Sequence, residues 1–193
     1  MKTIKCNKET DLVIKNSKFI TNVFRINKEE EIEKFLNQIK IKYSDANHNC
    51  YAYIYENTRK CSDDGEPSGT AGIPMLQVLE KKELSNLLVI VTRYFGGIKL
   101  GAPGLVRAYT NSVTNALNNN ELIELEKGKN INIIFNYDNI KQIDYILKDK
   151  NILNKEFSDN IKYNLNIDIE TLETLKKLNN IVIEINNEIY IEK

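Results

Sequence analysis

The stretch VTRYFGGIKLGAPGLVRAY, residues 91–109, determines how the first half of the chain must be organised. It continues the unbroken apolar run Leu87–Val91, which is typical of a strand buried on both faces. Half of the chain's eight glycines then fall within nine residues, at Gly96, Gly97, Gly101 and Gly104. Apolar side chains recur afterwards at helical spacing, namely Leu105, Tyr109, Val113 and Leu117. The pattern predicts a buried strand, a glycine-rich loop and a helix in succession.

This glycine-rich loop is a candidate anion site. Small residues let backbone amides approach an anion, and the N-terminus of the following helix favours negative charge. No P-loop is present, because Lys99 is not followed by Ser or Thr at the GxxxxGK spacing, so no ATPase is inferred. Alternatively, the glycines only supply positive φ and close packing at a turn. The predicted phosphate or RNA site comprises Arg93, Gly96, Gly97, Lys99, Gly101, Gly104 and Arg107.

Outward from this unit, the preceding residues predict a sheet with helices. Short apolar stretches between Lys2 and Ile26 indicate strands joined by tight turns. Asn27 and Glu30 resemble a capping box for a first helix over residues 28–42. Residues 50–55 form a further candidate strand, and residues 56–72 are rich in turn formers and predict a long loop. A helix is expected to begin around Pro74.

The last third of the chain has a different pattern. Residues 121–129 are predicted to connect two domains, residues 1–126 and 127–193. Beyond them the order is strand, helix, two strands around Asp159 and Asn160, a helix capped by Asp168, and a final strand. This β-α-β-β-α-β order predicts a ferredoxin-like domain and an α+β protein. The abundant asparagines are interpreted as a bias of composition, although the Asn186–Asn187 pair suggests a bulge.

Several other side chains could carry chemistry. Asp63, Asp64 and Glu66 could bind a hard cation, but beside Gly65 and Pro67 they more commonly build turns, so no metal is predicted. His48 is the only histidine, which rules out a site with several histidine ligands. Cys50 follows two residues later on the same side of a strand and could pair with it as a nucleophile. The residues expected to support the phosphate site are His48, Asp63, Asp64, Glu66, Ser68, Thr70 and Tyr94.

Composition limits the classes of function. The chain has 193 residues with 27 basic and 27 acidic side chains, which excludes a broad positive field, so any polyanion site must be local. Three cysteines without a CxxC pair argue against a disulfide framework and favour a reducing cytoplasm. There is neither a signal-peptide core nor a run of about 18 apolar residues. A soluble, cytoplasmic protein without a membrane partner is therefore expected, and its oligomeric state stays open.

Four segments together resemble the signature of the IMPACT family: KNSKFI (15–20), ANHNCYAY (46–53), DDGEPSGTAGIP (63–74) and residues 91–109. The similarity is to its bacterial, YigZ-type two-domain members. Pro103 departs from the pattern, which more often has glycine there, and removes one backbone donor. The resemblance implies a βαβ N-terminal domain like a ribosomal-protein domain and domain IV of elongation factor G. For the C-terminal domain it implies a likeness to domain V of the same factor.

The resemblance also implies a role. We expect a noncatalytic regulator or binding protein associated with translation, which contacts the ribosome, RNA or another phosphate-bearing partner through its basic glycine-rich loop. No catalytic residue and no cofactor are predicted. One alternative is a hydrolase that uses His48 and Cys50, or the carboxylates of Asp63, Asp64 and Glu66. The other is a protein-interaction module without a nucleic-acid role.

Overall fold

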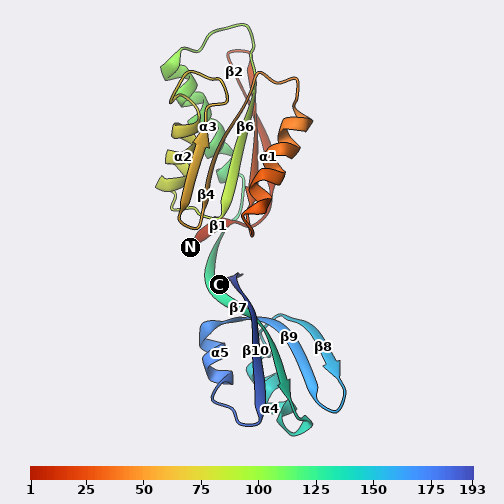
Figure 1. Cartoon of the computed structure of the whole chain (residues 1–193). Coiled ribbons are helices and arrows are strands. Elements are labelled where there is room, and N and C mark those ends of the chain that lie inside the picture. Colours follow the sequence, from red (N-terminus) through yellow and green to blue (C-terminus); the bar gives the residue numbers. More distant parts are fainter. The chain divides into compact units, whose positions relative to one another are not determined.

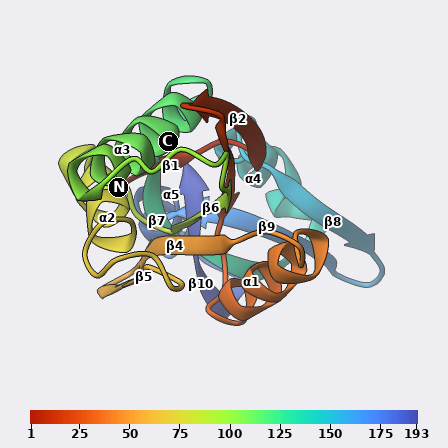
Figure 2. The same cartoon turned by 90° about the horizontal axis from the view of Figure 1, so that it is seen from above.

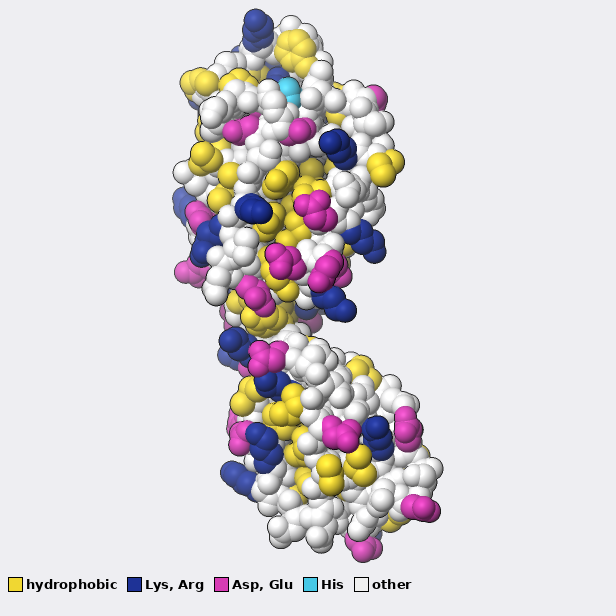
Figure 3. Space-filling model, in the orientation of Figure 1, with side chains coloured by type: hydrophobic (Ala, Val, Ile, Leu, Met, Phe, Trp, Pro, Cys, Tyr) yellow, Lys and Arg dark blue, Asp and Glu magenta, His cyan; other side chains and the backbone are white.

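The computed structural model describes all residues, 1–193, and the chain divides into two compact units. These are Met1–Ile123 and Glu124–Lys193, shown in Figure 1. Both combine helices with antiparallel sheets, so the predicted α+β class is confirmed. No helix is both long enough and apolar enough to cross a membrane. On the face shown in Figure 3, acidic and basic side chains are interspersed without a broad patch of one sign.

The first unit is built on a five-stranded antiparallel sheet of order β2-β3-β6-β4-β5. Its strands are β2 (Lys8–Ile14), β3 (Ser17–Arg25), β4 (His48–Tyr55), β5 (Thr58–Ser62) and β6 (Leu87–Tyr94). Its helices are α1 (Glu30–Lys42), α2 (Gly72–Lys81) and α3 (Ala102–Asn118). A short strand, β1 (Lys2–Ile4), precedes them, and the N–H of Lys5 after it donates to Glu121 O at 2.9 Å.

Strand β6 lies in the middle of this sheet, with a helical layer on each face. Helix α1 covers one face and helices α2 and α3 cover the other (Figures 1 and 2). Successive side chains of a strand point to opposite faces. Leu88 and Ile90 therefore join the core under α1, while Leu87, Val89 and Val91 join the core under α2 and α3. The prediction that this apolar run is a buried strand is confirmed.

Two local predictions for this unit were wrong. Residues 56–72 are not one loop, because β5 pairs with β4 as an antiparallel edge strand within that range. Its sequence, TRKCS, shows no apolar alternation, since an edge strand exposes much of its length. The expected capping box is also absent: Glu31 Oε2, not Glu30, accepts from Asn27 N–H at 2.7 Å, and α1 begins at Glu30.

The second unit has the expected β-α-β-β-α-β order. Its antiparallel strands run β10-β7-β9-β8 across the sheet, so the first strand lies beside the last and the third. They are β7 (Leu122–Phe135), β8 (Ile152–Phe157), β9 (Ile161–Asp168) and β10 (Ile181–Glu192). The helices are η1 (Tyr137–Asn139), α4 (Ile140–Ile146) and α5 (Ile169–Leu175). The register shifts between Ile185 and Asn187, which confirms the bulge.

The predicted connecting region, residues 121–129, contains the division between the two units after Ile123, and from Leu122 onward it forms the first part of strand β7. Its burial alternates, with Ile123 and Leu125 buried and their neighbours Glu124 and Leu122 exposed. The domain boundary at residue 126 stays a prediction.

The asparagines of this unit are placed by the sheet rather than by composition alone. In β7, Ile131 and Ile133 enter the core, so Asn130 and Asn132 face the opposite side. There they bond across strands: Asn130 Nδ2 donates to Asn166 Oδ1 at 2.8 Å, and Asn164 Nδ2 donates to Asn132 Oδ1 at 2.8 Å. These side chains therefore have a structural role in the sheet that the composition alone did not indicate.

Helix α5 begins with a charged cap that makes the second unit sensitive to acid. Asp168 accepts from Thr171 N–H at 2.7 Å and from Lys150 Nζ at 2.6 Å. Burial opposes the charged form, but these hydrogen bonds outweigh it and lower the pKa of Asp168 to about 2, against an ordinary value of 3.8. The carboxylate therefore stabilises the fold above about pH 4, and that stability is lost as the pH falls towards 2.

We expect Asp168→Ala to lower the free energy of unfolding at neutral pH by about 2 kcal/mol, because the cap and the Lys150 pair are both lost. Asp168→Asn is the control, since it keeps a capping oxygen and removes only the charge, and it should cost about half as much. Urea unfolding between pH 2 and pH 7 measures both. A constant difference between wild type and Asp168→Ala down to pH 2 would contradict the assigned charge effect.

Candidate functional site

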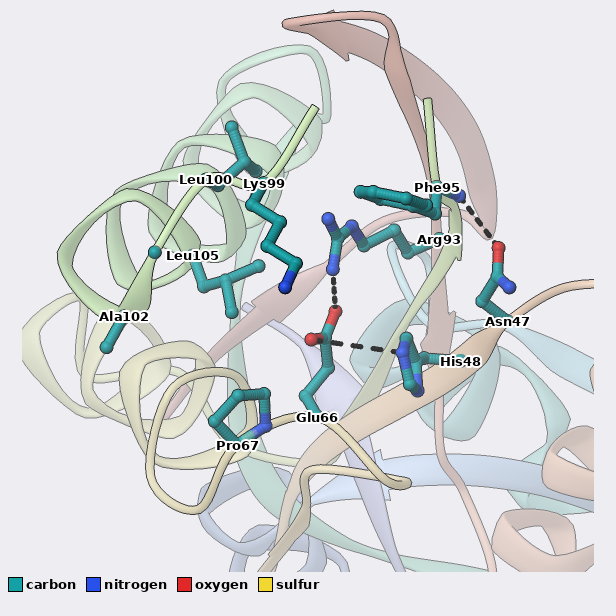
Figure 4. Close-up of a pocket in the computed structure, with 11 residues that line it drawn as sticks. Asn47, His48, Glu66, Pro67, Arg93, Phe95, Lys99, Leu100, Ala102 and Leu105 are labelled. Atoms are coloured by element: carbon teal, nitrogen blue, oxygen red, sulfur yellow. Dashed lines mark hydrogen bonds and ion pairs between the residues drawn. The ribbon is translucent and has the colours of Figure 1, made fainter. Parts of the chain in front are cut away.

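A cavity of about 470 Å³ opens in the first unit where the glycine-rich loop meets strand β4 and the loop after β5. Figure 4 shows its side chains converging from these three segments. It is lined by Asn47, His48, Glu66, Pro67, Arg93, Phe95, Lys99, Leu100, Gly101, Ala102 and Leu105. Charged groups and apolar surfaces therefore share one cavity.

The loop after β5, residues 63–71, is shaped by its two aspartates. Asp63 accepts backbone N–H groups from Gly69 at 2.8 Å, Ala71 at 2.9 Å and Gly72 at 2.8 Å. Burial opposes its charge, but these three amides outweigh it and lower the pKa of Asp63. Asp64 Oδ2 accepts from Asn49 N–H at 2.6 Å. Both carboxylates thus build the turn, and no cluster of three or more His, Cys, Asp or Glu side chains could hold a metal ion.

Glu66 is held inside the cavity wall by a buried ion pair. Its side chain is 3% exposed, and Oε1 accepts from Arg93 Nη1 at 2.6 Å and from Tyr109 Oη at 2.8 Å. The Arg93 side chain is 6% exposed and lies between the rings of Phe19 and Phe95, each 5.5 Å from its guanidinium carbon. Both donors act on the same oxygen, so Glu66 Oε2 stays free of them. Arg93 Nε is buried without a hydrogen-bond partner.

His48 lies beside this free oxygen in the cavity wall. Its Nδ1 lies 2.8 Å from the carbonyl oxygen of Asp64. A carbonyl can only accept, so Nδ1 carries a proton, and in the neutral ring Nε2 is an acceptor. Nε2 lies 3.9 Å from Glu66 Oε2, which is beyond hydrogen-bond distance (Figure 4). The dashed line in Figure 4 marks this contact as an ion pair, which requires a protonated ring, and no hydrogen bond joins the two atoms.

Cys50 does not form a nucleophilic pair with His48. The thiol is buried, and its single proton has two acceptors within reach, Asp63 O at 2.9 Å and Tyr109 Oη at 3.3 Å. Burial, with the negative charge of Glu66, raises the pKa of Cys50 to about 12. A thiol that stays protonated at neutral pH is a poor nucleophile. Cys50 is therefore unsuited to act as the nucleophile in the alternative hydrolase mechanism.

The glycine-rich loop approaches the cavity through contacts that only glycine permits. A side chain at Gly96 would meet the backbone of Asn16 at 2.0 Å, so this residue packs directly on the β2–β3 turn. Gly101 has a φ of 69° and precedes α3, where Leu105 N–H donates to Gly101 O at 2.9 Å. No side chain caps this helix. Lys99 is exposed, and Figure 4 shows its amino group directed into the cavity.

The structure gathers some of the predicted site residues and separates others. Lining the cavity are His48, Glu66, Arg93, Lys99 and Gly101. Arg107 is exposed on α3 and does not line it, so three cations do not converge here as expected. Tyr94 donates to Asp45 Oδ1 and Thr70 to Pro67 O, which gives both a local role. Also outside the lining are Asp63, Asp64, Ser68, Gly96, Gly97 and Gly104.

Sequence reasoning missed most of the apolar wall, namely Pro67, Phe95, Leu100, Ala102 and Leu105, together with Asn47. The sequence did indicate part of this apolar wall, because Phe95 and Leu100 lie inside the glycine-rich stretch, where large apolar residues are unusual. Asn47 carried no such signal. Its role is to accept from Phe95 N–H at 2.7 Å, which holds the loop onto the strand edge.

Comparisons with known proteins agree with the resemblance seen in the sequence. A family described as the Impact N-terminal domain matches residues 15–117. The IMPACT family member YvyE of Bacillus subtilis is 41% identical over 180 residues, covering 92% of this chain and 81% of that protein. The IMPACT family member YigZ of Escherichia coli is 39% identical over 109 residues, covering 54% and 53%. A crystal structure of a hypothetical protein covers 96% of this chain and 97% of its own, at 26% identity and a TM-score of 0.67.

Proposed function

The chain belongs to the IMPACT family, and from this premise we propose that it is a noncatalytic binding protein of the translation machinery, holding a phosphate-bearing group of RNA at its glycine-rich loop. Translation is the process that the family resemblance implies. The proposal includes the likeness of the two units to domains IV and V of elongation factor G. Antiparallel α+β units are compatible with that likeness, although fold alone does not fix function.

One observation carries the RNA contact: Lys99 and the uncapped start of α3 meet at the same cavity. The first amides of a helix point outward without intrahelical partners, and the helix dipole favours an anion there. Pro103 contributes no N–H, so Ala102 supplies the amide beside the lining residue Gly101. Lys99 adds a mobile positive charge.

Arg93 has a different part in this proposal from the one expected. Its charge is already balanced by Glu66 at 2.6 Å, and it is almost fully buried. A phosphate would have to compete with that carboxylate for the guanidinium. Arg93 therefore acts as a positioning residue for Glu66, and Lys99 is the cation left for the ligand.

We expect Lys99→Ala to weaken binding of a labelled mixed-sequence single-stranded RNA about tenfold, independently of sequence. The dependence of log affinity on log salt should flatten by about one phosphate contact. Fluorescence anisotropy over a salt series measures both quantities. Lys34→Ala is the matched control, because it removes the same charge from an exposed position of α1, on the other face of the sheet.

Arg107→Ala is an informative third variant, since Arg107 is exposed on α3 outside the cavity lining. It should reduce affinity less than Lys99→Ala. Equal RNA affinity and equal salt slopes for wild type, Lys99→Ala and Lys34→Ala would overturn the phosphate site.

A further inference from the structure

The cavity carries a pair of acceptors that a phosphate cannot satisfy. Glu66 Oε2 and His48 Nε2 lie 3.9 Å apart in its wall. No hydrogen bond from the chain reaches either atom, because Arg93 and Tyr109 both use Oε1 and the Nδ1 proton of His48 is committed to Asp64 O. Acceptors that a ligand covers lose their water and need a donor in exchange, so this wall is suited to a ligand that brings N–H or O–H groups.

Both acceptors of the pair are held in fixed positions, so the pair can discriminate between ligands by the positions of their donor groups. Glu66 is fixed by Arg93 and Tyr109, and His48 by Asp64, so neither side chain must be ordered when a ligand binds. Groups that are already held in place lose little conformational entropy when a ligand binds, so the favourable free energy of their hydrogen bonds contributes to affinity. A ligand that covers Glu66 Oε2 without donating to it would remove water from this oxygen and give no hydrogen bond in return, so a mismatched ligand is penalised.

The donor that fits here is neutral. A primary ammonium group would suit two acceptors, but Lys99, whose charge is not balanced by Glu66, lines the same cavity and would repel a second cation. The remaining wall is apolar, with Phe95, Pro67 and Leu105 among its residues. A flat ring bearing N–H groups meets both conditions, because its faces contact the apolar wall and its edge meets the acceptors.

Among the common RNA bases, guanine alone presents two adjacent donor groups, N1–H and the 2-amino group, on one edge. Adenine and cytosine place an acceptor beside their amino group, and uracil has a single N–H between two carbonyls. A carboxylate oxygen beside an imidazole acceptor therefore favours guanine.

We propose that this cavity selects a guanine splayed out of single-stranded RNA, with its N–H edge at Glu66 Oε2 and His48 Nε2 and its phosphate at Lys99. This inference rests on the proposed function, since it names the base attached to the phosphate bound there. Figure 4 shows the geometry: the lysine enters from one side of the cavity and the acceptor pair lies across from it. The cavity, about 470 Å³, falls within the size range of small-ligand sites.

The test leaves the protein intact and changes the ligand. Calorimetric titration of the full chain with 5′-GMP, 5′-IMP and 5′-AMP compares ligands that carry the same phosphate. IMP differs from GMP only by the missing 2-amino group, so we expect GMP to bind at least about tenfold more tightly than IMP or AMP. Equal affinities for the three nucleotides, or no binding of GMP, would overturn the guanine inference.

Two variants separate this inference from the proposed function. His48→Ala alters a partly exposed side chain and should reduce the preference for GMP over IMP, while the affinity for IMP changes little. Lys99→Ala should weaken GMP, IMP and AMP by the same factor, because it acts on the shared phosphate. A GMP preference that survives His48→Ala unchanged counts against the acceptor pair. If Lys99→Ala changes no affinity while the GMP preference persists, the phosphate site fails and the guanine site stands.

Discussion

Replacing Glu66 by leucine is expected to lower the free energy of unfolding of the first unit by about 3–5 kcal/mol. The change leaves the Arg93 guanidinium buried with its charge unpaired, and it removes the acceptor of the Tyr109 hydroxyl. The energy of a single surface contact is far smaller. Urea unfolding followed by circular dichroism measures the loss.

Glu80→Leu provides the matched control for this substitution. Glu80 pairs with Arg59 at 3.4 Å, but their side chains are 45% and 55% exposed, so the pair should contribute only about 0–1 kcal/mol. A second comparison is the double variant Glu66→Leu with Arg93→Met, which removes both charges and should recover much of the lost stability. If Glu66→Leu were no more destabilising than Glu80→Leu, the buried pair would not be the support of the cavity that its geometry indicates.

Gly96→Ala is expected to cost at least about 3 kcal/mol, at the upper end of the range for overpacking. The added methyl carbon would lie 2.0 Å from the carbonyl carbon of Asn16 and 2.4 Å from Ser17 N. These are backbone atoms of the tight β2–β3 turn, where Lys15 and Asn16 already have positive φ, so they cannot move aside cheaply. Thermal unfolding of the purified variant measures the effect.

Gly97→Ala, one residue further, is the control for this prediction. Nothing lies within 4 Å of a side chain added there, and the cost comes only from a φ of 81°. It should therefore amount to about 1–2 kcal/mol. Similar losses for the two variants would mean that the loop does not rest on the β2–β3 turn as the structure places it.

Much of the fold was predictable because buried strands and helices have characteristic patterns of apolar residues in the sequence. The run from Leu87 to Val91 is apolar throughout, as expected of a central strand with helices on both faces. Strand β5 has no such apolar pattern, because an edge strand is held by backbone hydrogen bonds that any side chain allows. The start of β7 was predicted only as a connection between domains, because its alternating charged residues can equally describe a linker or a half-exposed strand.

The candidate site was only partly predictable. Lys99 and Gly101 of the glycine-rich loop do line the cavity, because strand, loop and helix are continuous in the chain. Arg107 was expected to join them, yet the helix carries it away from the cavity lining. Cys50 looked available as a nucleophile, and only its buried hydrogen bonds to Asp63 and Tyr109 exclude that role.

The sequence by itself determined the family, the two successive patterns of strands and helices, and the position of the glycine-rich loop, because these depend on local order and on periodic burial. Only the tertiary structure decided which of the predicted cations is already paired with a carboxylate and which is available to a ligand. Arg93 and Glu66 are separated by 27 positions, and their pairing at 2.6 Å depends on how a loop folds over the end of β6. A charge neutralised by a distant partner looks the same in sequence as one available to a ligand, since electrostatic interaction depends on distance in space and on burial.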